Sequence, residues 1–264
     1  MTFKILYTAD LHGNKEYYKK LMAKAKGSEI KAVVIGGDLC PKGGPTIEDA
    51  VKAQKEFLEN FFIPELRKLK KDVFVIMGND DFRINEIILK NANENLKYIN
   101  KKRFNLFNKN IVGYSFVNPT PFRLKDWEKF EDEKKEMPLP MHDYEIRTVK
   151  KEEGTIKEDL SNLIKLSNPK KTIYVIHAPP FNTKLDIIAS GAHVGSKAIR
   201  GFIEKEQPYL ALHGHIHESP QMSGSFIDKI GNTMCINVGS SYPENKLNCI
   251  IIDIDNLDLK YMEL

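Results

Sequence analysis

The chain has few of the residues and segments that mark secreted or membrane proteins. Its 264 residues include three cysteines, Cys40, Cys235 and Cys249, with no C-x-x-C pair. This small, odd number excludes a disulfide-built scaffold and favours reduced thiols. We find no secretory leader, and no apolar run approaches the ~20 residues that a membrane-spanning helix needs. We therefore expect a soluble, cytoplasmic protein without a membrane partner.

An excess of charge of one sign is also lacking. The 40 lysines and arginines are balanced by 36 aspartates and glutamates, and only 6 of the basic residues are arginine. Nucleic-acid-binding proteins concentrate basic residues on one face, and arginine supplies the bidentate contacts to phosphate. We therefore do not expect a nucleic-acid partner.

Apolar periodicity predicts one α/β domain over residues 1–264, without internal repeats. Helical spacing is predicted over 14–27, 83–93 and 155–167, and Pro64 is expected to kink or divide a longer helix. The last three strand-like runs are expected to pair antiparallel, because their connections are too short for crossovers. These runs are 233–238, 248–254 and 257–262.

Residues 118–153 differ in composition from the rest of the chain. Half of them, 18 of 36, are charged, and four prolines interrupt any regular pattern. The segment also holds the only tryptophan, Trp127, together with Phe122, Phe130 and Tyr144. We interpret it as a charged insertion. A solvated excursion with a few anchoring aromatics is favoured over the alternative, a lid above the substrate.

Polar residues follow the ends of five strand-like runs. The runs are 5–9 before Asp10 and His12, 32–35 before Asp38, 73–77 before Asn79 and Asp80, 173–176 before His177, and 209–212 before His213, His215 and His217. In layered α/β folds, ligands bind beyond the carboxyl ends of strands. These side chains are therefore expected to converge on one pocket.

The residue types in this set suit a metal ion. In extended chain, residues two apart face the same way, so Asp10 and His12 can reach one ion. An isolated D-x-H is more often a cap beside a surface histidine, but three histidines at alternate positions favour a metal that binds neutral imidazole. Asp38 offers a carboxylate, and Asn79 offers a carbonyl oxygen unless it serves only as a turn residue.

The ordered blocks D-x-H, G-D, G-N-x, a lone H and G-H-x-H resemble those of the calcineurin-like metallophosphoesterase superfamily, over about residues 3–255. The resemblance implies a four-layer αββα sandwich with two mixed β-sheets and a binuclear metal centre. Its pattern assigns Asp38 to both ions as a bridge. One ion would add Asp10, His12 and His217, and the other would add Asn79, His177 and His215.

The implied activity is hydrolysis of a small phosphate ester. Two dications ~3.5 to 4 Å apart lower the pKa of a bridging water, so that a metal-bridging hydroxide attacks phosphorus in line. The candidate ions are Mn, Fe, Ni, Co and Zn, with Mn favoured; mixed nitrogen and oxygen ligands suit them all. Asp38, Asn79 and Asp80 are the candidate catalytic positions, and a nucleotide-like ester is one candidate substrate.

One position departs from the family pattern. Most members carry histidine directly after the motif asparagine, whereas this chain has Asp80. It resembles small relatives of archaeal or bacterial type that lack this histidine and lean toward phosphodiesters. An ionised carboxylate cannot donate a proton and repels a monoester dianion more than a singly charged diester. The sequence therefore favours phosphodiesters.

Four further residues are candidates for substrate contacts, namely Arg83, His193, Ser196 and His213. A glycine-containing turn before a helix can present backbone N–H groups to an anion, which places His193 and Ser196 near phosphate. A serine cap beside a structural histidine explains the same pattern equally well, and Arg83 could be an ordinary surface residue. His142, in the insertion, is expected to be exposed.

Two other functions fit the same fold. A nuclease would need a stronger basic surface, and an interaction or sensor protein that binds metal or nucleotide would need little catalysis. Because all seven ligand positions are filled, the enzyme is favoured over both. A homo-oligomer is compatible with the sequence.

Overall fold

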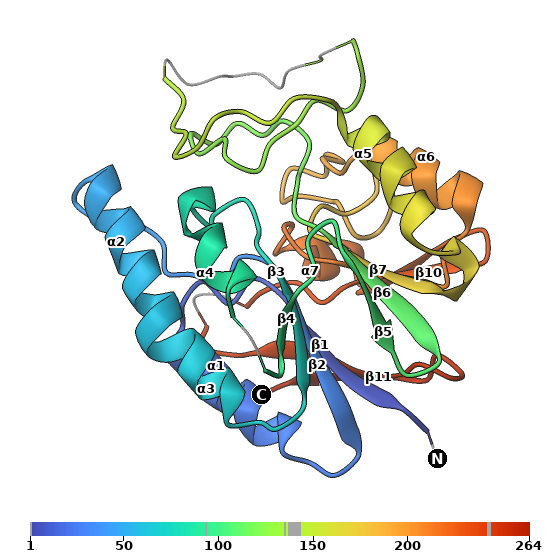
Figure 1. Ribbon diagram of the computed structural model, residues 1–264. Helices are drawn as coiled ribbons and strands as arrows, with labels where there is room; N and C mark the ends of the chain where they lie inside the picture. Colours follow the sequence, from blue (N-terminus) through green and yellow to red (C-terminus); the bar gives the residue numbers. More distant parts are fainter. Residues whose placement is uncertain (1, 93, 135, 137–143, 242–243) are drawn as a thin grey trace.

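The computed structural model describes residues 2–92, 94–134, 136, 144–241 and 244–264, and it contains two six-stranded β-sheets (Figure 1). The first sheet has the order β12 (Leu259–Glu263), β11 (Asn248–Asp253), β1 (Lys4–Thr8), β2 (Ile30–Gly36), β3 (Asp72–Ile76) and β4 (Leu96–Tyr98). The second has the order β5 (Arg103–Leu106), β6 (Lys109–Tyr114), β7 (Thr172–Ile176), β8 (Leu210–His213), β10 (Thr233–Asn237) and β9 (Ile227–Ile230).

Both sheets are mixed. Strands β1 to β4 are parallel to one another, and so are β6, β7, β8 and β10. Antiparallel pairs complete the edges, with β11 beside β1, β12 beside β11, β5 beside β6, and β9 beside β10. Because the central strands within each sheet are parallel, their carboxyl ends lie along the same edge of that sheet.

Successive side chains of the central strands belong to different buried clusters, and this alternation explains the layers of the sandwich. In β1, Ile5 and Tyr7 belong to a buried cluster shared with Ile173 and Val175 of β7, whereas Leu6 belongs to a second cluster with residues of the helices. Successive side chains of a strand point to opposite faces, so each central strand packs against the other sheet on one side and against helices on the other. The αββα sandwich with two mixed sheets, expected from the family resemblance, is confirmed.

Helices cover the outer faces. They are α1 (Lys15–Ala25), α2 (Ile47–Phe57), α3 (Ile63–Arg67), α4 (Glu86–Lys90), α5 (Ile156–Leu163) and α6 (Lys197–Glu206). The chain also contains the short helix α7 (Ser219–Ser223), a π-helical turn at Leu58–Phe62 and 3-10 turns at Arg83–Asn85, Ile164–Leu166 and Pro169–Lys171. Pro64 divides the long helix as predicted, since it lies in the first turn of α3 after the π turn. No helix among the described residues is long and apolar enough to span a membrane.

The antiparallel prediction for the last strands is partly wrong. Strands β11 and β12 form the expected antiparallel pair. Strand β10, however, lies in the other sheet and runs parallel to β8, because α7 and β9 intervene and return the chain to the same end. All three cysteines are buried and free, as expected.

The start of the insertion is a packed part of the fold. Trp127 is fully buried, and Lys125 and Lys129 beside it are 5% and 2% exposed. The insertion's other aromatic residues are less covered, since Phe130 is partly buried and both Phe122 and Tyr144, expected as anchors, are about half exposed. Trp127 therefore anchors the insertion, and the two lysines beside it are packed, whereas Phe122 and Tyr144 are partly solvated. The insertion lies along the top of Figure 1. The lid stays a prediction, and His142 lies outside the described residues.

The two sheets lie in close contact beside Gly113 of β6. A Cβ atom there would lie 2.4 Å from a methyl group of Ile76 in β3 and 2.8 Å from Cγ1 of Ile99. These neighbours are buried and cannot move aside.

We predict that Gly113→Ala lowers the free energy of unfolding by about 1 to 3 kcal/mol, because a methyl group overpacks the space between the sheets. Gly201→Ala is the matched control, since Gly201 lies inside α6 with nothing within 4 Å of its added Cβ. That control should raise the unfolding free energy by up to about 1 kcal/mol. Equal effects of the two substitutions in urea denaturation would contradict the prediction.

Candidate metal centre

The carboxyl ends of both sheets deliver polar side chains to one place. Asp10, Asp38 and Asn79 lie two or three residues after β1, β2 and β3. His177 directly follows β7, and His215 lies two residues after β8. Residues far apart in the sequence therefore meet where the two sheets end.

The backbone at these positions is not extended. Asp10, His12, Asp38 and His215 have φ angles of 58°, 43°, 50° and 69°. The sequence predicted that residues two apart share one face of an extended segment, both for Asp10 and His12 and for the three histidines of the last block. That prediction is therefore wrong. Left-handed conformations are costly for residues other than glycine and often occur at functional sites.

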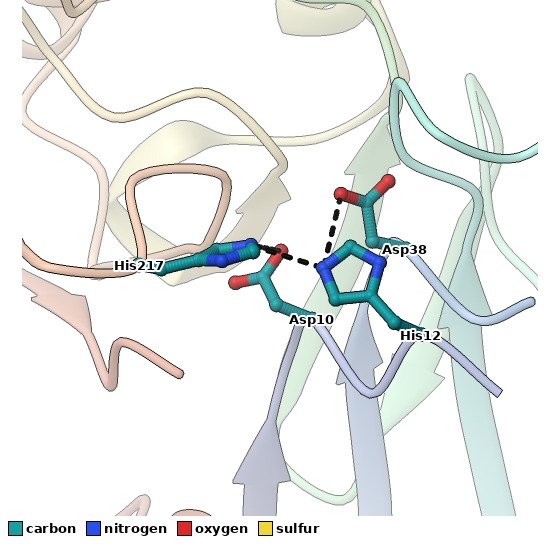
Figure 2. Close-up of side chains that lie close together, drawn as sticks. All are labelled: Asp10, His12, Asp38 and His217. Carbon is teal, nitrogen blue, oxygen red and sulfur yellow. Dashed lines mark hydrogen bonds and ion pairs between the residues drawn. The ribbon is translucent and has the colours of Figure 1, made fainter. Parts of the chain in front are cut away.

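One group of side chains contains Asp10, His12, Asp38 and His217, whose ligand atoms all lie within 4.8 Å of one another (Figure 2). The Nε2 atoms of His12 and His217 are 3.0 Å apart. Asp10 Oδ1 is 3.8 Å from His217 Nε2, and Asp38 Oδ2 is 3.8 Å from His12 Nε2. The arrangement can hold a metal ion.

A second group lies on the other side of Asp38. His177 Nε2 is 3.0 Å from Asn79 Oδ1 and 3.5 Å from Asp38 Oδ1. The ring centroid of His215 lies 5.3 Å from that of His177. The Asp38 carboxylate thus turns Oδ2 toward the first group and Oδ1 toward the second.

The electrostatics of the site suit a cation. Burial lowers the pKa of His12 and of His215 to about 3 each, so both rings are neutral and keep a lone pair for a ligand. Burial opposes the charge of His177, but Asp38 raises the pKa of His177 to about 9. Burial also raises the pKa of Asp10. A dication would supply the positive charge that these buried carboxylates lack, so the residues fit the metal that the family pattern implies.

The ring of His177 is oriented by a contact of Nδ1, the nitrogen that does not face Asp38. Its Nδ1 lies 2.8 Å from the carbonyl oxygen of Gly36, a contact that requires the proton on Nδ1 when the ring is neutral. The Nε2 lone pair then faces Asp38 and Asn79. Such a second contact fixes the ring and raises its basicity as a metal ligand.

Asp81 is a functional position that the sequence did not reveal. Its fully buried carboxylate accepts hydrogen bonds from the backbone N–H groups of Leu39, Cys40 and Gly78 at 3.0, 2.8 and 2.9 Å. It thereby joins the loop that carries Asp38 to the loop that carries Asn79. The second aspartate of the N-D-D sequence was the only signal.

Asp80 has a cationic neighbour. Its Oδ2 lies 2.7 Å from Lys42 Nζ and 3.7 Å from His12 Nδ1, and its backbone N–H donates to Asp38 Oδ1 at 2.9 Å. From the sequence alone, Asp80 was expected to be an ionised carboxylate that repels a monoester dianion. The contact with Lys42 offsets part of the repulsion that this carboxylate would exert on a phosphate dianion.

His213 is held by contacts with the backbone. It is fully buried in β8, and its Nδ1 lies 3.0 and 2.9 Å from the carbonyl oxygens of Ile176 and Ala178. Burial lowers the pKa of its ring to about 4, so it stays neutral. These contacts link β8 to the end of β7 and favour a structural role over the expected substrate contact.

The other substrate candidates also have internal partners. The guanidinium of Arg83 pairs with Glu152 and stacks 5.0 Å from the ring of Trp127. Ser196 caps α6 by accepting from the Ile199 N–H at 3.1 Å. These contacts favour the ordinary alternatives that the sequence left open for both residues.

The amino end of α6 already has an anion. The Glu131 carboxylate of the insertion accepts hydrogen bonds from Ser196 Oγ at 2.6 Å and from the backbone N–H groups of Lys197 and Ala198 at 2.8 and 3.0 Å. The expected phosphate site at this turn is therefore filled by a protein side chain. His193 Nδ1 nearby lies 2.7 Å from the buried Asp186.

The insertion holds the loop that follows Asn79. Trp127 Nε1 donates to the Asp81 carbonyl oxygen at 2.8 Å, and Asp126 Oδ2 accepts from the Arg83 N–H at 2.9 Å. Both contacts are buried or nearly so. The insertion therefore positions residues directly beside the candidate ligands.

Known proteins resemble the chain over nearly its whole length. The family model for calcineurin-like phosphoesterases matches residues 3–219. The uncharacterized protein MJ1162 of Methanocaldococcus jannaschii is 33% identical over 260 residues, or 95% of each chain. The crystal structure of TT1561 of Thermus thermophilus superposes with a TM-score of 0.65 at 15% identity, over 100% of this chain and 99% of that one. Another crystal structure gives a TM-score of 0.71 at 16% identity, with coverage of 100% and 99%.

We predict that Trp127→Phe weakens metal binding and lowers the free energy of unfolding by about 1 to 3 kcal/mol, because the buried Asp81 carbonyl loses its donor while the aromatic ring is kept. Isothermal titration with Mn²⁺ and urea denaturation measure the two effects. Tyr144→Phe is the control, since it removes an exposed hydroxyl from the same insertion. A Trp127→Phe protein that matches wild type in both measurements would refute the positioning role.

Proposed function

The chain belongs to the calcineurin-like phosphoesterase family, and on that premise we propose that it hydrolyses phosphate esters, phosphodiesters in particular, with two divalent or transition-metal ions. The family supports a hydrolase of phosphate esters in general. The number of ions and the diester preference are our own proposals.

The orientation of Asp38 carries the proposal of two ions. One oxygen faces His12 and the other faces His177, at 3.8 and 3.5 Å. A carboxylate between two sets of nitrogen and oxygen ligands is suited to bridge two cations. Asp10, His12 and His217 would complete the first set, and Asn79, His177 and His215 the second. Mn is our first choice of ion, with Fe, Ni, Co and Zn as the alternatives.

The bound ions would supply Lewis acidity and lower the pKa of a shared water. The protein residues would hold and orient the reacting groups. Asp81 fixes the two ligand loops relative to each other, and Gly36 fixes the ring of His177. Rigid placement of this kind supplies much of the advantage of a two-metal site.

The diester preference rests on Asp80. Its carboxylate lies beside Asp38 and His12 and presents negative charge to this side of the site, although Lys42 offsets part of that charge. Burial and the neighbouring Asp38 raise the pKa of Asp80 and thereby oppose its ionisation, whereas Lys42 favours the charged form. A singly charged diester meets less repulsion there than a monoester dianion.

We expect the metal-free protein to bind about two equivalents of Mn²⁺ and to gain esterase activity as it does so. Asp38→Asn should lose more affinity than the roughly 10- to 100-fold that removal of an outer contact costs, because it weakens a ligand shared by both ions. Asparagine also tolerates the left-handed backbone of residue 38.

Metal analysis, isothermal titration and a panel of mono- and diesters under each candidate ion measure these effects. Asp258→Ala is the control, since Asp258 is exposed and precedes β12 beside the amino end of β1. Two bound ions without turnover of any ester would instead favour a binding or sensor protein.

We predict that Asp80→His raises the ratio of monoester to diester kcat/KM by roughly 10-fold or more, because it removes a negative charge and adds a proton donor. Asp80→Asn separates these causes, as it removes the charge without supplying an acid. A ratio that stays at the wild-type value in both variants would rule out Asp80 as the source of the preference.

A further inference from the structure

We propose that Lys42 is a substrate-contacting residue whose ammonium group binds a phosphate oxygen of the ester at the open side of the metal-ligand cluster. The proposal rests on the proposed function and deepens it. Nothing in the family pattern of metal ligands assigns a role to this residue, which lies in the loop after Asp38.

Asp80 holds the Lys42 ammonium beside the cluster. Lys42 Nζ is 2.7 Å from Asp80 Oδ2, and this same oxygen is 3.7 Å from His12 Nδ1. The other oxygen of Asp80 accepts a hydrogen bond from Asn79 Nδ2 at 3.0 Å. A single carboxylate thus connects the lysine to a candidate ligand of each ion.

A buried glutamine fixes the lysine loop to the Asp80 loop. Gln54 of α2 is 1% exposed, and its Nε2 donates to the carbonyl oxygens of Pro41 and Asp80 at 3.1 and 2.8 Å. Its Oε1 accepts from the Phe82 N–H at 2.7 Å. The residues flanking Lys42 and Asp80 are therefore held in register by the fold, and the ion pair does not depend on two flexible side chains alone.

The ammonium keeps donors for another acceptor. A lysine carries three N–H donors, and Asp80 is the one ion-pair partner of Lys42 among the residues that the structure describes. The Lys42 side chain is 47% exposed, against 25% for Asp80 and 1% for His12. Its remaining donors therefore reach the solvent side from which a phosphate ester must approach the buried ligands.

The charge of Lys42 lies beside the cluster. Its Nζ atom is 2.7 Å from Asp80 Oδ2, and that oxygen is 3.7 Å from His12 Nδ1. A phosphate oxyanion at the cluster would therefore lie within the reach of this charge, and lysine binds phosphate as a point charge.

The consequence is a site in which the usual histidine after Asn79 is replaced by two residues. Asp80 orients, and Lys42 supplies the positive charge and the hydrogen-bond donors. This division adds phosphate affinity without placing a proton donor at residue 80, and it makes Lys42 a determinant of how tightly the anion is held.

The test measures inorganic phosphate binding to the Mn²⁺-loaded protein by isothermal titration. Lys42→Met should weaken phosphate binding about 10- to 100-fold, as expected for loss of a charged hydrogen bond, and Lys42→Arg should restore most of it. Affinity for Mn²⁺ should change less than about threefold. Lys52→Met is the control, because Lys52 is a 74% exposed lysine of the neighbouring α2.

The double variant Lys42→Met/Asp80→Asn distinguishes contact with phosphate from neutralisation of Asp80. If Lys42 contacts the anion, the double variant still binds phosphate more weakly than Asp80→Asn alone. Equal phosphate affinity of these two proteins, or wild-type affinity of Lys42→Met, would overturn the proposal. Phosphate binding requires no turnover, so an inactive wild-type protein would refute the proposed function and leave this test intact.

Discussion

The placement of the Asp38 carboxylate between side chains from both sheets is the constraint on which the site depends. His177 from the second sheet reaches it only because two glycines keep the space clear. A Cβ on Gly78 would lie 2.3 Å from Asp38 Oδ1 and 2.5 Å from His177 Nε2, and one on Gly37 would lie 2.5 Å from His177 Nδ1. The distance between the two sheets at this edge can therefore change very little without moving Asp38 or His177.

Polar contacts then keep the loops in that geometry. Asp81 ties the Asp38 loop to the Asn79 loop, Gln54 ties both to α2, and Trp127 holds the far side through the Asp81 carbonyl. The left-handed backbone at Asp10, His12 and Asp38 costs free energy, and such conformations persist where the surroundings determine them. The charged insertion is thus a support for the site as well as a surface feature.

Much of this could be predicted from the sequence, because the relevant signals are local. Apolar runs that end in Asp10, Asp38, Asn79 and His177 placed these residues at the strand ends. The ordered motifs led to the family and its fold. The sequence left alternatives open where a residue has a partner elsewhere in the chain. Arg83 pairs with Glu152, and Glu131 fills the helix terminus that was expected to bind phosphate.

The sequence by itself determined the donor set, since residue types and their order fix which chemistry the chain can offer. Only the tertiary structure decided which donors share a space. His213 and His215 are two residues apart, yet the left-handed turn at His215 directs one to the β7 carbonyls and the other toward His177. Lys42 and Asp80 are likewise 38 positions apart and meet through the loops that Gln54 joins. Such contacts depend on packing between distant segments, which no local pattern of residues encodes.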